Sequence, residues 1–510
     1  MKKLPLLTAA LILVFNSRAQ QTFEKYYLAT GTASMTLDEL SNGNLFTGIA
    51  YQSGISLMDA QGNILQTHCY DLIPFLVLQS VRKHTDNEIR FVGGYLPGSC
   101  SVGSGTAANP VIGKMDSLGN ILAINQYQLN AINCFNVASD LVITNDGGVV
   151  TWGRDQSPFA LRVDAAGMPI WSKQFNHHGS FGFIQELPSG DLLAGLNMDT
   201  AGMTVARLDA NGDILWCKSY FRPKGKTYDC LIESDSSFII IGATDSLAAG
   251  NQKLFMMRLN GTGDVEWCRG YHTMQYWMPY SRIVRSNDDN YVVLATLSNA
   301  GRPFLMKTDQ NGDTLWSRSA GVSGYGYFTT SILAAGDGGF YYDGGAEGDF
   351  GLWSSAAYLF KTDSLGHLPC SEASPPPIVV SDLFPVDSSF TLSSISGATA
   401  FPITVADAFY DPVVTYDGCT ITSVINPMRP NKFRVRPNPT SGLVTVEFED
   451  PLMAESYYSV YDAMGRLLYQ RPLPAGATTE EIDLSRYGKG TYAIKLTDKE
   501  GVRFERVVLE

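Results

Sequence analysis

Residues 207–220 read RLDANGDILWCKSY, with an aspartate, a glycine, a tryptophan and a tyrosine at defined distances from one another. The Asp209 side chain can hydrogen-bond the nearby backbone, and Gly212 can adopt a positive φ without steric cost. Together these two residues predict a tight hairpin between two strands. Trp216 and Tyr220 are an even number of residues apart, so in a strand both face the same side and can pack between sheets.

The same pattern recurs along the chain at intervals of 45 to 57 residues, a period typical of propeller blades rather than of helical solenoids. Each copy follows two β-rich runs joined by a polar turn, as in FIQELPSGDLLAGL at 183–196, so each unit is predicted to contain four short strands. The positions equivalent to Asp209, each followed three residues later by glycine, are Asp59, Asp116, Asp164, Asp209, Asn260, Asp309 and Asp363.

One unit cannot bury the face that carries its tryptophan, but stacking units in a ring buries it against a neighbour. The pattern resembles the seven-bladed β-propeller repeats of bacterial exported proteins, whose units end in a similar hairpin. We therefore predict an all-β chain with a seven-bladed β-propeller at 20–370, followed by a small immunoglobulin-like β-sandwich. This resemblance implies a fold and not a chemistry.

An acidic cation loop is the functional alternative for the DANGD hairpin. An EF-hand loop has glycine at position six and glutamate at position twelve, whereas this stretch has glycine at position four and Tyr220 at position twelve. The six histidines also lie outside HExxH and other metal-ligand spacings. We therefore predict a structural hairpin, no metal site and no cofactor.

The closure of the ring can be predicted from the two ends of the repeat region. The seventh copy ends in KTDSLGHLPC at 361–370, with Cys370 in place of the tryptophan. FEKYY at 23–27 has the same order of aromatic and lysine residues as WCKSY at 216–220. We predict that residues 22–28 close the last blade as its outermost strand.

The N-terminus predicts export from the cytoplasm. Residues 1–19 have two lysines before an apolar run and a small-residue cleavage site, which is typical of a secretory signal peptide. The net charge of -13 argues against a nucleic-acid partner, because phosphate-binding surfaces depend on lysine and arginine.

Export permits disulfide bonds among the eight cysteines. We predict that Cys370 pairs with Cys419, because these two residues bracket a Ser/Pro-rich segment of different composition. The region 371–430 is predicted to be this extended segment and a linker. The other cysteines have no predicted pairing, and they are Cys69, Cys100, Cys134, Cys217, Cys230 and Cys268.

Residues 431–510 alternate apolar and polar positions between Gly, Pro and Asp turns, which predicts the β-sandwich. An ordinary immunoglobulin-like module is one reading. However, the order and spacing of the turn motifs closely resemble the type A sorting domain of the type IX secretion system. The resemblance implies Sec export to the periplasm, contact with the secretion machinery, and delivery to the cell surface or the medium. The residues that carry it are Pro437, Asn438, Pro439, Gly442, Tyr461, Asp462, Gly465, Arg466, Gly490, Tyr492 and Lys495.

The sequence contains neither a GxSxG elbow nor a P-loop, so these motifs give no indication of an enzyme. Loops that join one blade to the next should surround the channel mouth, and their side chains could stack on sugar rings, hold a peptide, or pack between blades. We expect a monomeric, non-catalytic binding or adhesion module for glycan or protein. A secreted polysaccharide- or peptide-degrading enzyme with its site at the mouth, and a purely structural envelope component, are the alternatives. The candidate ligand-binding residues are Tyr276, Trp277, Tyr280, Tyr325, Tyr327, His177, His178 and Tyr228.

Overall fold

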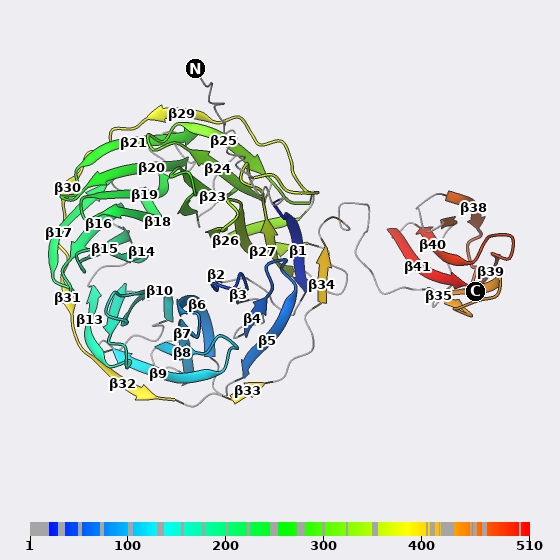
Figure 1. Ribbon diagram of the computed structural model, residues 1–510, viewed down its shortest axis with the longest axis horizontal. Helices are drawn as coiled ribbons and strands as arrows, with labels where there is room; N and C mark the ends of the chain where they lie inside the picture. Colours follow the sequence, from blue (N-terminus) through cyan, green and yellow to red (C-terminus); the bar gives the residue numbers. More distant parts are fainter. Residues whose placement is uncertain are drawn as a thin grey trace, which may run out of the picture.

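The computed structural model consists of a ring of β-sheets and a separate small body at the C-terminus (Figure 1). Within the described residues, no helix is long and apolar enough to span a membrane. The described residues are 20–28, 36–48, 54–71, 76–99, 106–129, 137–154, 158–175, 179–199, 202–221, 225–244, 253–272, 281–297, 301–322, 325–348, 355–403, 406–408, 414–417, 419, 433–448, 451, 456–461, 467–498 and 501–510.

In the part of the chain that is described, the ring contains seven antiparallel sheets, and in each of them four strands follow one another from the channel outward. Six sheets use four strands that are consecutive in the chain, and the last sheet takes its fourth strand from the N-terminus. In chain order the sheets contain β2 (Leu37–Glu39), β3 (Leu45–Thr47), β4 (Gly54–Met58) and β5 (Ile64–Asp71); β6 (Leu76–Thr85), β7 (Glu88–Ser99), β8 (Thr106–Met115) and β9 (Ile121–Leu129); β10 (Val137–Ile143), β11 (Val149–Arg154), β12 (Phe159–Val163) and β13 (Pro169–Phe175); β14 (Gly179–Glu186), β15 (Leu192–Met198), β16 (Gly202–Leu208) and β17 (Ile214–Tyr220); β18 (Gly225–Ser234), β19 (Ser237–Thr244), β20 (Lys253–Asn260) and β21 (Val265–His272); β22 (Arg282–Arg285), β23 (Tyr291–Leu297), β24 (Arg302–Thr308) and β25 (Thr314–Ser319); and β26 (Gly326–Ala334), β27 (Phe340–Glu347), β28 (Ser355–Lys361) and β1 (Phe23–Leu28).

The repeated aspartate and glycine form the hairpin between the third and fourth strands. The Asp209 carboxylate accepts hydrogen bonds from the backbone N–H groups of Asn211 and Asp213, at 2.8 and 2.9 Å. Gly212 has a φ of 77° and donates its N–H to the Asp209 carbonyl oxygen at 2.9 Å. The aspartate therefore supplies hydrogen-bond acceptors to the backbone N–H groups of the turn. Glycine adopts the positive φ at a lower steric cost than any other residue.

The aromatic residues of the pattern bind each hairpin to the preceding sheet. The Trp216 indole N–H donates to the Gly261 carbonyl oxygen at 3.0 Å, and the Tyr220 hydroxyl donates to the Gly263 carbonyl oxygen. A Cβ atom on Gly263 would lie 2.8 Å from the Trp216 ring. The repeated glycine is thus required twice, for its positive φ and for the aromatic ring that packs on it.

The N-terminal strand completes the last sheet of the ring. β1 pairs antiparallel with β28, with Phe23 opposite Lys361 and Tyr27 opposite Ala357. Its position within the sheet differs from the sequence-based prediction, because β34 (Val414–Asp417) pairs with the far edge of β1. β1 is therefore the fourth strand and not the outermost one, because a later segment covers the backbone groups that its outer edge would leave unpaired.

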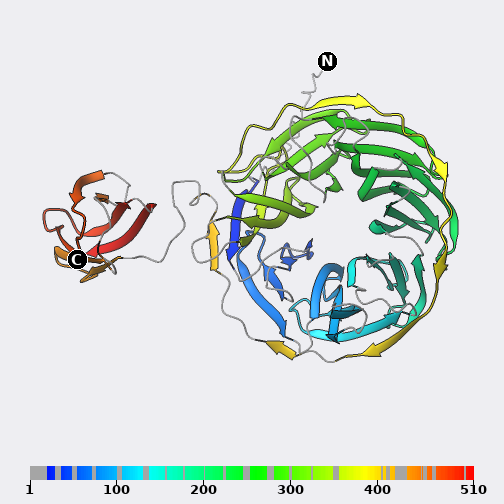
Figure 2. The same ribbon diagram turned by 180° about the vertical axis from the view of Figure 1, so that it is seen from behind.

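The described residues 371–403, 406–408 and 414–417, which we call the belt, follow one another around the outside of the ring (Figure 2). The belt adds a fifth strand to six sheets, in the reverse of their chain order, and an isolated bridge between Ala373 and Ser319 joins it to the remaining sheet. Its strands with their partners are β29 (Val379–Asp382) on β21, β30 (Ser388–Ser389) on β17, β31 (Ser394–Ile395) on β13, β32 (Ala398–Pro402) on β9, β33 (Ala406–Ala408) on β5, and β34 on β1.

The C-terminal body is a β-sandwich with a core of its own. Fifteen buried side chains between Phe433 and Leu509 form one apolar cluster, and Val460, Ile494 and Val507 lie near its centre with at most 1% exposure. The first sheet contains β35 (Phe433–Arg436), β36 (Leu443–Phe448) and β39 (Thr479–Asp483), and the second contains β37 (Ser456–Tyr461), β38 (Leu467–Leu473), β40 (Gly490–Asp498) and β41 (Gly501–Leu509).

Candidate functional site

The channel-side strands of five sheets carry a β-bulge near the same end. β6, β10, β14, β18 and β26 are the innermost strands of their sheets, and each shifts its register within its first five residues. The bulges therefore lie toward the end of the channel at which these strands begin, which we call the channel mouth. The residues that the pairing skips, here called the mouth bulges, are Gln79, Ser139, Gly182, Tyr228 and Thr330.

An arginine and a carboxylate join two of the bulged strands. Asp140, on β10, accepts hydrogen bonds from the Ser80 hydroxyl at 2.6 Å and from the Arg82 guanidinium at 3.0 Å, both on β6. The Arg82 side chain is 31% exposed. The ion pair therefore fixes the relative position of two neighbouring strands while part of the guanidinium faces solvent.

A second arginine joins the bulges of two other sheets. Arg282 donates to the Thr330 carbonyl oxygen at 3.0 Å and to the Tyr228 carbonyl oxygen at 3.3 Å. Asp229 accepts N–H bonds from Cys230 and Ile283, at 2.8 and 3.1 Å. Burial raises the pKa of Asp229, and the charge of Arg282 and the two backbone donors oppose that rise. Each oxygen of the Asp229 carboxylate therefore accepts one backbone hydrogen bond.

The carboxylate of Asp343 on β27 also accepts hydrogen bonds from neighbouring strands. It is 1% exposed and accepts bonds from the hydroxyls of Thr330 and Thr47, at 2.9 and 3.1 Å. Among the described residues, no group of three or more His, Cys, Asp or Glu side chains could hold a metal ion. The channel wall that is described can therefore offer polar contacts and charge, while these three carboxylates serve to bind the strands together.

The candidate ligand-binding residues are only partly described. Tyr228 and Tyr327 are buried, at 8% and 2% exposure, and Tyr325 is half-buried against the core of the last sheet. The Tyr327 hydroxyl lies 2.7 Å from the Tyr26 hydroxyl and accepts the Val322 N–H at 2.9 Å, so it also ties the N-terminal strand to the ring. Five other candidates lie outside the described residues, namely His177, His178, Tyr276, Trp277 and Tyr280.

Sequence reasoning singled out Tyr228 as a candidate residue but did not find the mouth bulges as a group. Their residues share no chemical character, and a bulge is a property of pairing between two strands rather than of one segment. Asp140 and Asp229 follow directly after bulged residues. An aspartate within the first β-rich run of a unit was the signal that could have indicated them.

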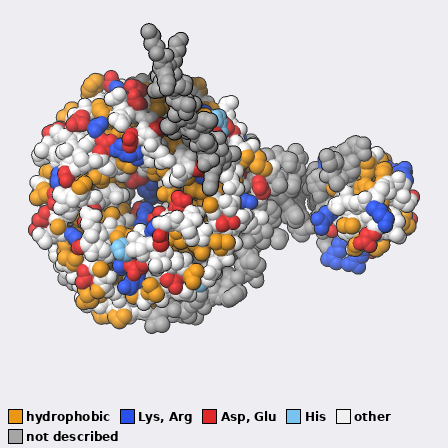
Figure 3. Space-filling view, in the orientation of Figure 1, with side chains coloured by type: hydrophobic (Ala, Val, Ile, Leu, Met, Phe, Trp, Pro, Cys, Tyr) orange, Lys and Arg blue, Asp and Glu red, His pale blue; other side chains and the backbone are white. Residues whose placement is uncertain are grey.

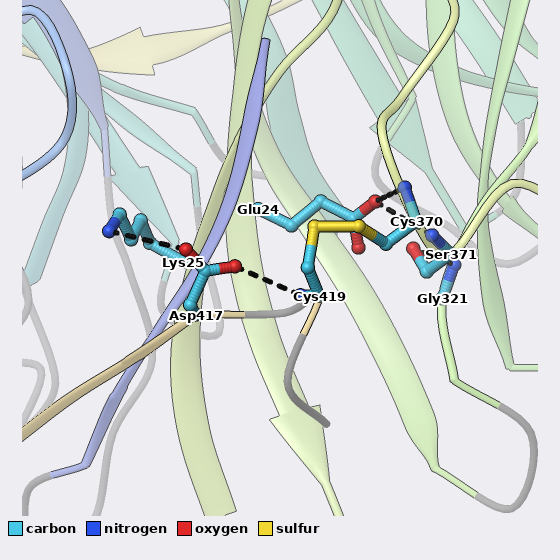
Figure 4. Close-up of a disulfide and its surroundings, with 7 residues drawn as sticks. All are labelled: Glu24, Lys25, Gly321, Cys370, Ser371, Asp417 and Cys419. Carbon is cyan, nitrogen blue, oxygen red and sulfur yellow. Dashed lines mark hydrogen bonds and ion pairs between the residues drawn. A yellow bond between two sulfur atoms is a disulfide. The ribbon is translucent and has the colours of Figure 1, made fainter. Parts of the chain in front are cut away.

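The belt begins and ends at one junction beside the N-terminal strand (Figure 4). A disulfide joins Cys370 to Cys419, which confirms the predicted pair. The Glu24 carboxylate accepts the N–H groups of Cys370 and Ser371, at 2.9 and 2.7 Å. Burial raises the pKa of Glu24 against the effect of these hydrogen bonds. Asp417 accepts the Cys419 N–H at 3.0 Å and lies 3.8 Å from the Lys25 ammonium.

Several C-terminal motif residues have structural contacts inside the sandwich. The Asn438 side-chain amide donates to the Arg506 carbonyl oxygen at 2.6 Å and accepts the Val508 N–H at 3.0 Å, so it binds the last strand through two backbone groups. The Tyr492 hydroxyl donates to the Gly488 carbonyl oxygen. The motif residues outside the described ranges are Asp462, Gly465 and Arg466.

The sequence of this sandwich matches a known family. Residues 434–510 match the secretion system C-terminal sorting domain. This match indicates export to the cell surface or secretion, and it implies contact between the sorting domain and the secretion machinery. The comparison with curated proteins found no match.

Solved structures resemble the chain at low sequence identity. The WD40 domain of Pan2 from Neurospora crassa shares 10% identity with a TM-score of 0.45, over 68% of this chain and 99% of that one. Virginiamycin B lyase from Staphylococcus aureus shares 12% with a TM-score of 0.46, over 66% and 98%. PorZ from Porphyromonas gingivalis, a bacterial surface component of the type-IX secretion system, shares 11% with a TM-score of 0.28, over 94% and 82%. None of these likenesses bears on the activity of this chain.

Proposed function

We propose that the protein is an exported binding or adhesion module that holds a glycan or a protein segment at the channel mouth without catalysis. The observation that carries this proposal is the recurrence of β-bulges in five channel-side strands near the same end. A β-bulge redirects side chains and leaves some backbone groups outside the pairing of the two strands, and bulges are common beside active sites. Exposed groups at this opening, such as the Ser139 side chain, would supply polar contacts that orient a ligand, while Arg282 holds the carbonyl oxygens of Tyr228 and Thr330.

The carboxylates favour binding over hydrolysis. Glycoside hydrolysis requires two carboxyl groups free to face the substrate at a defined separation. Asp140, Asp229 and Asp343 instead accept hydrogen bonds from their neighbours in the wall. Basic, acidic and apolar side chains are interspersed over the face of the ring that is seen in Figure 3, which suits a ligand of mixed polarity.

The belt supports a monomeric protein. Outer strands of sheets are common sites of pairing with a second chain. Here the belt covers the outer edge of six sheets with strands of two to five residues, and short edge strands discourage further pairing. The sorting domain would deliver this closed ring to the cell surface or the medium.

Binding to immobilised glycans and surface proteins, with the full chain and with analysis of any released products, tests the proposal. Ser139→Trp places a large side chain on an exposed mouth bulge and should weaken retention at least tenfold. Asn211→Trp makes the same change on an exposed hairpin at the opposite end of a sheet and should leave retention unchanged. Equal retention of both variants would place the ligand elsewhere, and released products would make the protein an enzyme.

A further inference from the structure

We propose that the Cys370–Cys419 disulfide turns the belt into a covalent hoop, so that tension on the sorting domain does not pull the belt strands off the ring. The belt leaves the last sheet at Cys370, passes all seven sheets and returns to β1 at Cys419. The two Cα atoms are 5.1 Å apart although 49 residues separate them in the chain. The disulfide therefore encloses the circumference of the ring in a single covalent loop.

Without this bond the belt would be held by many small attachments. Its strands pair over two residues at β30 and β31, three at β33, four at β29 and β34, and five at β32. Several of its apolar side chains face solvent, with Phe384 87% exposed and Val386 85% exposed. The belt is therefore attached by short runs of backbone hydrogen bonds, by single bonds such as that from the Leu383 N–H to the Cys268 carbonyl oxygen at 2.9 Å, and by a few partly buried side chains such as Phe390 and Leu392.

The position of the sorting domain determines how a load reaches these attachments. The sorting domain follows Cys419 in the chain, so tension on it arrives at the end of the belt. In the absence of the disulfide, that tension would first separate β34 from β1 and then load the other belt strands one after another. Attachments that break in sequence resist far less force than attachments that must break together, because each step has its own small barrier.

The disulfide sends the load along a different path. Tension at Cys419 passes through the sulfur atoms to Cys370, whose N–H is bound by the buried Glu24 carboxylate. The next residue, Ser371, is bound by the same carboxylate, and its carbonyl oxygen accepts the Gly321 N–H at 3.1 Å. The load therefore reaches the closed body of the ring and bypasses the belt. The disulfide thereby keeps the belt strands on the outer edges of six sheets during export.

Single-molecule pulling on the full chain, with one handle at Asn211 and the other at Glu510, tests this proposal. In the wild-type protein we expect the sorting domain to unfold and no further extension before the ring ruptures. The Cys370→Ser/Cys419→Ser double variant should show an additional extension of about 160 Å at lower force, because the two positions are 49 apart in sequence and an extended chain spans about 3.3 Å per position.

Reduction of the folded wild-type protein supplies a second readout that does not depend on the folding of the variant. Reductant added after folding should produce the same additional extension, whereas the double variant should be insensitive to it. A wild-type trace that shows the belt extension without reductant would overturn the proposal. Reduced wild-type protein or double variant that extends no further than the oxidised protein would overturn it as well.

Discussion

The Tyr27 hydroxyl donates a hydrogen bond to the carbonyl oxygen of Gly62, with 2.6 Å between the two oxygen atoms. Tyr271 makes the same bond to Gly312, at 2.7 Å, from the fourth strand of another sheet. Tyr27 is fully buried, and it belongs to the first described strand of the chain. The N-terminal strand therefore contacts its neighbouring hairpin through the same chemistry as an ordinary fourth strand, and this contact closes the ring.

Deletion of residues 20–28 should destabilise the whole ring. The deletion removes the strand between β28 and β34, so both would lose their hydrogen-bonding partner, and the buried Tyr26 and Tyr27 side chains would be lost. We expect a thermal unfolding midpoint at least 10 °C lower, measured by circular dichroism, since a loss of about 3–5 kcal/mol is usual for a single large core truncation. An unchanged midpoint would show that β1 is an accessory tail.

Gly263→Ala tests the two roles of the repeated glycine, and Gly190→Ala, in the hairpin between β14 and β15, is its control. Both residues have positive φ, at 79° and 87°, so alanine should cost each about 1 kcal/mol. Only at Gly263 would the new Cβ meet a side chain, the Trp216 ring at 2.8 Å, whereas Gly190 has open space around it. We expect Gly263→Ala to lose about 1–3 kcal/mol more in chemical denaturation. Equal losses would mean that the indole moves aside freely.

Glu24→Gln should change the pH dependence of stability. Burial raises the folded-state pKa of Glu24, so the protonated form is favoured in the folded protein. Its contribution is complete below the ordinary carboxyl pKa of about 4.3 and is lost as the pH rises through the raised value. Glutamine can still accept the Cys370 and Ser371 N–H groups without ionising.

The free energy of unfolding of Glu24→Gln, measured from about pH 4 to 7, should therefore fall less with rising pH than that of the wild type. A matched control is Glu347→Gln, because Glu347 is the exposed last residue of β27. This control should keep the wild-type slope. A variant at position 24 with the wild-type slope would show that Glu24 does not lose its proton in this range.

Deletion of residues 433–510 should block export without unfolding the ring. The sandwich has its own apolar core, and the ring core contains none of its residues. We expect the truncated protein to accumulate in the periplasm as a protease-resistant fragment, detected by cell fractionation. Surface display at the wild-type level would contradict the role of the sorting domain.

The parts of the fold that could be predicted from sequence are those with local causes. Asp209, Gly212 and Trp216 lie within one hairpin, so turn chemistry and an even spacing were sufficient to indicate the strands and their packed face. The match between FEKYY and WCKSY indicated the closing strand because both ends of the same pattern were present in the chain.

The belt and the mouth bulges had no such local signal. β29 pairs with β21, more than one hundred residues earlier in the chain, and its four residues show no clear alternation of buried and exposed positions. The closing strand was therefore predicted at the outer edge, where the belt in fact covers it. The bulge at Ser139 likewise depends on the register of β10 against β11, which a single segment does not contain.

The most direct test of the closed belt is a peptide map of the exported protein, digested without reduction after free thiols have been blocked under denaturing conditions. In the folded protein the two cysteines of the junction lie side by side because the belt has passed around the ring. We predict one linked peptide pair that contains Cys370 and Cys419, with Cys217, Cys230 and Cys268 recovered as blocked thiols. Recovery of Cys370 or Cys419 as a blocked thiol, or in a bond to another cysteine, would contradict the hoop.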